Sequence, residues 1–125
     1  MMNKTQSNDD EITISHLKKI VDKFVSESDW EKYHTPKNLA ESISIEAAEL
    51  LELFQWRNDR EIEMFLEDPK FVSEIEEELA DVLIYCISFA NRLNIDISRA
   101  ILSKMEKNKR KYPIDLYKGK LGKPK

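Results

Sequence analysis

The chain has 125 residues, of which 35% are charged and 41% hydrophobic, and its formal net charge is -4. This length fits one domain of ordinary size, and the composition is typical of a folded, soluble protein rather than a disordered chain. Residues 104–125 hold nine basic and two acidic side chains, whereas residues 1–103 hold eleven basic and twenty-two acidic ones. An acidic body with a basic end does not fit a surface that binds duplex DNA, but it is compatible with a metal ion and phosphates.

The rare residue types exclude several classes of site. The two glycines, Gly119 and Gly122, lie in the last seven residues, so phosphate-binding loops, dinucleotide-binding motifs and nucleophile elbows are excluded. The single cysteine, Cys86, excludes an intrachain disulfide and a multi-cysteine zinc site, and the apolar run around it predicts a buried thiol.

Residues 1–11 lack the apolar segment of a signal peptide, and the longest apolar run, 82–90, is far shorter than the ~20 residues of a membrane span. We therefore expect a cytoplasmic protein without a membrane partner.

Apolar residues recur at helical spacing through most of the chain, with no sustained alternation of the strand type, and predict an all-α fold. After a disordered tail over residues 1–11, the first helix is predicted from Thr13 to about Ser28. A loop follows that holds Trp30, Tyr33, His34 and Pro36. Asn38 is the predicted N-cap of the second helix, residues 39–56, with Glu41 as its capping-box partner.

The second half of the chain has its own start and stop signals. A short turn or helix is predicted over residues 59–66, and Asp68 followed by Pro69 is predicted to begin a third helix that ends near Leu93. Asp96 caps a predicted fourth helix, residues 97–111, which Pro113 ends. The predicted domain therefore covers residues 12–113, and residues 114–125 form a basic tail. The pattern favours a four- to five-helix bundle whose apolar surface predicts a dimer-based oligomer, a homodimer or a homotetramer.

Two acidic residues interrupt the apolar faces of the second and third helices. Glu46 lies in the stripe of residues 39, 43, 46, 50 and 53, and Glu49 follows three residues later. Glu78 lies in the stripe of residues 75, 78, 82, 85 and 89, and Asp81 follows at the same interval. No basic residue occurs in residues 39–56 or 71–91.

A carboxylate that faces a core is costly unless it is paired, protonated or bound to a metal. If the two helices pack face to face, the four carboxylates need a countercharge, and a divalent cation with oxygen ligands, usually Mg²⁺, supplies one. Spacing alone leaves a second interpretation open, in which both pairs belong to solvated acidic helix faces. A di-iron site is disfavoured, because the only E-x-x-H candidate, Glu31 to His34, is followed closely by Pro36.

The segments SIEAAELLELFQW, EELADVLIY and SKMEKNKRKYP resemble the all-α nucleoside triphosphate pyrophosphohydrolases of the MazG type, and most closely their dCTP pyrophosphatase branch. The resemblance covers about residues 29–113. It implies hydrolysis of a nucleoside triphosphate to monophosphate and diphosphate with Mg²⁺, for which Mn²⁺ is an expected substitute. The preferred substrate would be dCTP or a modified dCTP, and the role would be to cleanse the nucleotide pool.

The resemblance also implies roles for individual residues. The metal ligands would be Glu46, Glu49, Glu78 and Asp81, and Glu49 would handle the attacking water. The base and sugar would contact Trp30, His34, Trp56 and Tyr85. The triphosphate would face the end of the fourth helix, at Lys104, Asn108, Lys111 and Tyr112.

Two departures from the family pattern bear on specificity. Ile45 stands where many MazG-type sequences have a second acid, which agrees with the dCTP-type branch. Val21 stands where some dCTP-type enzymes have a histidine, so one base or sugar contact is missing. The alternatives to an enzyme are a non-catalytic helical module that binds nucleotide or metal, such as a regulatory partner, and a plain interaction bundle.

Overall fold

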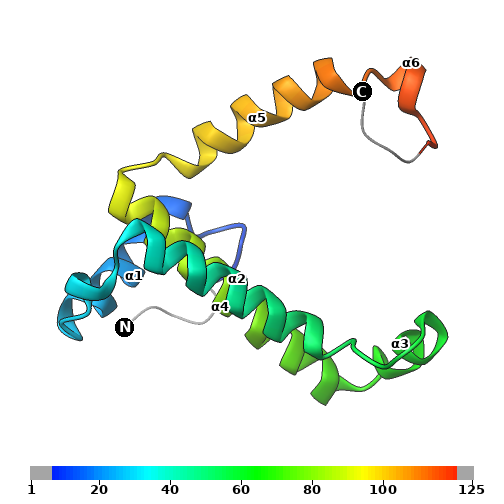
Figure 1. Ribbon diagram of the computed structural model, residues 1–125, viewed down its shortest axis with the longest axis horizontal. Coiled ribbons are helices and arrows are strands. Elements are labelled where there is room, and N and C mark those ends of the chain that lie inside the picture. The colour runs from blue at the N-terminus through cyan, green and yellow to red at the C-terminus, as the bar shows by residue number, and fades with distance from the viewer. Residues whose placement is uncertain (1–6, 121–125) are drawn as a thin grey trace. The chain divides into compact units, whose positions relative to one another are not determined.

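The structure, a computed structural model, describes residues 7–120, and all of its regular elements are helices (Figure 1). They are α1 (Ile14–Glu27), the 3₁₀ turn η2 (Glu31–Tyr33), α2 (Pro36–Glu52), α3 (Asp59–Phe65), α4 (Pro69–Leu93), α5 (Ile97–Lys111) and α6 (Ile114–Tyr117). Within residues 7–120 there is no strand, so the predicted all-α class is confirmed. The chain forms two compact units, which divide between Asn94 and Ile95.

The first unit is built around α4, which is 25 residues long. Helix α2 runs antiparallel beside α4, and α1 packs on α4 as well (Figure 1). The buried apolar side chains are Val25, Leu39, Phe71 and Ala90, one or more from each of these helices. The side-chain amide of Asn91 donates a hydrogen bond of 3.0 Å to the carbonyl oxygen of Lys18, which fixes α1 against α4.

Most helix starts follow the capping residues that the sequence indicates. The side chains of Asp68 and Asp96 accept hydrogen bonds from the backbone amides of Lys70 and Arg99, as predicted for α4 and α5. Thr13 caps α1 in the same way through His16, and Ser28 is its C-cap. These polar caps satisfy amides that have no partner inside the helix.

The predicted bounds of the second helix, residues 39–56, were wrong at both ends. The helix begins at Pro36, because the Thr35 hydroxyl accepts from the amide of Asn38 and proline fits the first helical position. Asn38 is therefore inside the helix, and its side-chain amide donates to the carbonyl oxygen of Tyr33 at 3.0 Å. At the other end the helix stops at Glu52, and the chain continues in turns to Trp56.

The second unit contains α5 and α6. Helix α6 occupies part of the segment predicted as a basic tail, and the ring of Tyr117 packs edge-on against Tyr112 at 5.4 Å. A local aromatic contact therefore orders a segment whose apolar content alone did not predict a helix. The remainder of that tail, residues 121–125, and residues 1–6 of the predicted N-terminal tail lie outside the described residues. No helix among the described residues is long and apolar enough to cross a membrane.

Candidate active site

The two stripes that the sequence singles out form the facing surfaces of α2 and α4. On α2, Leu39 is almost fully buried and Ile43, Glu46, Leu50 and Leu53 are half-buried, whereas Ile45 between them is 58% exposed. On α4, Glu78 is half-buried together with the apolar and aromatic members of its stripe, Ile75, Val82, Tyr85 and Phe89. The packing of α2 on α4 thus carries Glu46 and Glu78 into the interface between the helices, as the interrupted stripes indicate.

Three of the four predicted metal ligands converge. One carboxylate oxygen from each of Glu46, Glu49 and Glu78 lies within 4.8 Å of the other two. Asp81 is exposed and its carboxylate is not part of this trio, but its charge acts on both Glu46 and Glu78. We call Glu46, Glu49, Glu78 and Asp81 the acidic cluster.

Burial and mutual repulsion disfavour the ionised forms of two of these acids. Loss of water around Glu46 raises its pKa above the ordinary 4.5, and a hydrogen bond with Glu49 and the charges of Glu49, Asp81 and Glu78 raise it further. The pKa of Glu78 is raised in the same direction, first by burial and then by the charges of Glu49 and Asp81. Protons or a bound cation would therefore relieve the repulsion within the cluster.

The orientation of the carboxylates fits a cation better than protons alone. The Oε2 atoms of Glu46 and Glu78 are buried, and neither has a hydrogen-bond partner among the described residues. Buried polar atoms in folded proteins almost always have a partner, so two such oxygens beside a third carboxylate indicate a missing ligand. Carboxylate oxygens are the donors that Mg²⁺ and similar hard cations prefer.

A cavity lined by aromatic side chains adjoins the acidic cluster. It has a volume of about 280 Å³, and we call it the aromatic pocket; it is lined by Trp30, Tyr33, His34, Asn38, Leu39, Ser42 and Tyr85. Ser42 lies one helical turn before Glu46 on α2, and Tyr85 lies one turn after Asp81 on α4. The structure thus gathers Trp30, His34 and Tyr85, three of the four residues expected at the base and sugar, next to the acids.

Trp56, the fourth residue expected at the base, is not in the aromatic pocket. Its side chain is 92% exposed, and its backbone has a φ of 69°, in the left-handed region that bulky residues rarely adopt. Its neighbour Arg57 is held in place, because the guanidinium lies 4.1 Å from the ring centre of Phe65 and 5.0 Å from that of Phe71. The Trp56 side chain is therefore exposed on a turn that the Arg57 contacts hold in place. Its contact with a base stays a prediction.

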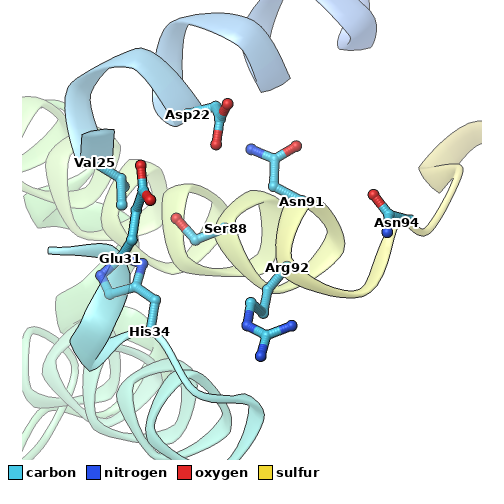
Figure 2. Close-up of a pocket in the computed structure, with 8 residues that line it drawn as sticks. All are labelled: Asp22, Val25, Glu31, His34, Ser88, Asn91, Arg92 and Asn94. Carbon is cyan, nitrogen blue, oxygen red and sulfur yellow. The ribbon is translucent and has the colours of Figure 1, made fainter. Parts of the chain in front are cut away.

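A second cavity shares His34 with the aromatic pocket (Figure 2). It has a volume of about 330 Å³, and we call it the Ser88 pocket; it is lined by Asp22, Val25, Glu31, His34, Ser88, Asn91, Arg92 and Asn94. Ser88 and Arg92 continue the three-four spacing of residues 78, 81 and 85 along one face of α4. Sequence reasoning missed these residues: extending that spacing by two more turns reaches them, but the spacing does not show that they line a pocket.

The residues expected at the triphosphate belong to the second unit. Lys104, Asn108 and Lys111 share one face of α5 by their spacing, and Tyr112 is its C-cap. Lys104 and Lys111 are exposed, whereas Asn108 and Tyr112 are half-buried. Their contact with a triphosphate stays a prediction.

The fold and the site define an all-α protein in which three carboxylates, from an i, i+3 pair on α2 and from Glu78 on α4, converge between two neighbouring helices and could hold a metal ion. The sequence model of the MazG-like family matches residues 41–120, which include every acid of the cluster. The chain belongs to the MazG-like family.

Individual relatives are similar over most of the chain. It is 40% identical over 109 residues to dCTP pyrophosphatase 1 of Rattus norvegicus and 41% identical over 106 residues to dCTP pyrophosphatase 1 of Homo sapiens. These matches cover 87% and 85% of the chain, but the chain spans only 64% and 62% of the two relatives. A crystal structure of a pyrophosphatase from Archaeoglobus fulgidus superposes with a TM-score of 0.73 at 51% identity, over 80% of this chain and 92% of that one.

Proposed function

We propose that the chain is a divalent-metal-dependent nucleoside triphosphate pyrophosphohydrolase that converts a (d)NTP and water to a (d)NMP and diphosphate. The observation that carries the proposal is the acidic cluster, in which two buried carboxylate oxygens have no partner among residues 7–120. Relatives named dCTP pyrophosphatase and pyrophosphatase support the reaction type.

The four acids of the cluster would hold Mg²⁺, or Mn²⁺ in its place. A bound divalent cation neutralises phosphate charge and lowers the pKa of a coordinated water. Glu49 is exposed and lies beside the carboxylates of Glu46 and Glu78, and in this proposal it would orient the attacking water and accept its proton. The water oxygen would attack the α-phosphorus, and diphosphate would leave with the electrons of the broken P–O bond.

The aromatic pocket supports a nucleoside as the rest of the substrate. Trp30, His34 and Tyr85 offer flat rings to a base or sugar close to the acids that would hold the metal ion. We propose dCTP or a modified dCTP as the substrate, in agreement with the names of the relatives. The basic face of α5, with Lys104, Asn108, Lys111 and Tyr112, would hold the triphosphate, and the enzyme would cleanse the nucleotide pool in the cytoplasm.

The test is incubation with each dNTP and Mg²⁺, followed by separate measurement of dNMP, diphosphate and orthophosphate. We expect equal amounts of dNMP and diphosphate, and no turnover after addition of EDTA. Glu49→Gln should lower kcat by at least about a hundredfold, whereas Glu74→Gln, an exposed acid on α4 outside the cluster, should retain full activity. Release of orthophosphate alone would overturn the proposal.

The second candidate, a non-catalytic module that binds nucleotide or metal, predicts a different result. Such a protein would gain thermal stability with Mg²⁺ and a nonhydrolysable dNTP but would release no diphosphate. The names of the relatives, which are pyrophosphatases, favour the enzyme.

A further inference from the structure

The Ser88 pocket joins polar groups of both signs in one cavity, beyond those that the proposed chemistry uses. Asp22 comes from α1, Glu31 from η2, and Ser88 and Arg92 from α4. Figure 2 shows all of these side chains around the same space, with the Ser88 hydroxyl pointing to the side where Val25 and Glu31 lie. Ser88 is 5% exposed, so its hydroxyl is a polar group carried into the interior of the unit.

The charged side chains of this pocket form no ion pairs with one another in the described part of the chain. Among residues 7–120, the ion pairs do not include Asp22, Glu31 or Arg92. The pocket therefore presents carboxylate acceptors and guanidinium donors at once, which is the surface that a neutral ligand with both amine and carbonyl groups needs. A phosphate would meet repulsion from two carboxylates, and a simple cation would meet repulsion from Arg92.

The pocket lies within reach of a nucleotide bound at the acidic cluster. Ser88 follows Asp81 by seven residues on the same face of α4, about 10 Å along the helix axis. The sugar and base of a nucleotide extend in this direction if its phosphates lie at the acids and its sugar lies beside Tyr85. His34 forms a wall of both the aromatic pocket and the Ser88 pocket, so a base stacked against it has one edge toward the polar groups.

We infer that the Ser88 pocket reads the hydrogen-bonding edge of the substrate base and selects cytosine, with Glu31 accepting from the exocyclic amine and Arg92 donating to the base carbonyl. This inference rests on the proposed function and adds to it the residues that determine specificity. Carboxylates pair with the amine of cytosine and not with the carbonyl that replaces it in uracil and thymine. Guanidinium donors match the carbonyl that all three pyrimidines share.

The two residues have separable signatures in a panel of dCTP, dUTP, dTTP and dATP. Glu31→Gln should lower kcat/KM for dCTP about tenfold and leave dUTP unchanged or improved, because an amide both donates and accepts. Arg92→Met should lower kcat/KM for dCTP and dUTP equally and leave dATP unchanged. The matched controls are Glu63→Gln and Arg60→Met on the exposed surface of α3, which should keep the wild-type pattern.

A binding experiment separates this inference from the proposed reaction. In EDTA, the wild-type protein should bind dCMP more tightly than dUMP by calorimetry or NMR titration, and Glu31→Gln should remove the preference.

If the wild type releases diphosphate but Glu31→Gln leaves the dCTP/dUTP ratio within about twofold of wild type, the inference is wrong and the function stands. If no dNTP is hydrolysed but the preference for dCMP appears and depends on Glu31, the function is wrong and the inference stands. Absence of any dCMP preference overturns the inference.

Discussion

Glu46 and Glu78 lie where burial and neighbouring acids disfavour an ionised carboxylate. In the metal-free protein this lowers the stability of the folded state as the pH rises. Both have a pKa raised above 4.5 in the folded state, chiefly by burial and then by neighbouring acids. A raised pKa means that the folded state binds protons more tightly than the unfolded state. The contribution to stability is therefore present below about pH 4.5 and is lost as the pH rises through the raised values.

This gives a prediction for thermal unfolding in EDTA. Glu78→Gln, which removes the charge and keeps the shape, should raise the Tm relative to wild type at pH 8 and have a smaller effect at pH 4, below the ordinary pKa of the carboxyl. Mg²⁺ should raise the wild-type Tm more at pH 8 than at pH 4, because protons compete with the cation for Glu46 and Glu78 at low pH. A Glu78→Gln variant that is less stable than wild type at pH 8 without metal would contradict this account.

The positions of these two acids could be predicted from the sequence, whereas the polar pocket beyond them could not. A charge inside an apolar stripe is visible from spacing alone, because packing of the stripe carries the charge with it. Ser88 and Arg92 become informative only when Glu31 and Asp22 are known to lie opposite, and those residues come from two other elements. Spacing within one helix does not encode such contacts.

At the scale of the elements, the wrong bounds predicted for α2 show that capping residues and apolar spacing alone do not decide where a helix begins and ends. Thr35 and Asn38 are both good capping residues three positions apart, and the choice of Thr35 depends on Pro36 at the first helical position. Apolar and aromatic residues continue at helical spacing beyond Glu52, yet the chain turns there. The Arg57 contacts with Phe65 and Phe71 fix this turn, and they join residues that no helical period relates.

The turn holds Trp56 in an unfavourable backbone conformation, from which a testable prediction follows. A left-handed φ costs a non-glycine residue on the order of 1 kcal/mol, and the exposed ring recovers little of this by packing in the protomer. Trp56→Gly should therefore raise the free energy of unfolding by about 1 kcal/mol or leave it unchanged, while KM for the preferred dNTP rises severalfold. Urea unfolding and steady-state kinetics measure the two effects.

The control for this variant is Trp56→Asn, which tolerates the same φ and also lacks the ring. It should share the rise in KM, since the ring and not the backbone would contact the base. An unchanged KM in both variants would show that Trp56 does not meet the substrate. A loss of stability in both would show that its ring is buried in the assembled protein.

At the scale of the whole molecule, many apolar side chains of residues 7–120 are exposed. On α4, Leu79 and Leu83 are 46% and 51% exposed and lie one turn apart on the same face. Ile45 on α2 is 58% exposed, and Leu102 on α5 is 67% exposed. Exposed apolar residues at this density are typical of surfaces that a second chain covers.

We therefore predict a homodimer, or a tetramer built from dimers, with Leu83 in a contact between copies. Light scattering coupled to size-exclusion chromatography should give two or four times the protomer mass of 14.7 kDa. Leu83→Asp should shift the protein toward the monomer, because burial of an unpaired carboxylate in an apolar contact is strongly unfavourable. Glu74→Lys, at an exposed acid on the opposite face of the same helix, should leave the mass unchanged. A wild-type protein that elutes as a monomer at micromolar concentration would contradict the prediction, and the exposed leucines would then need another partner.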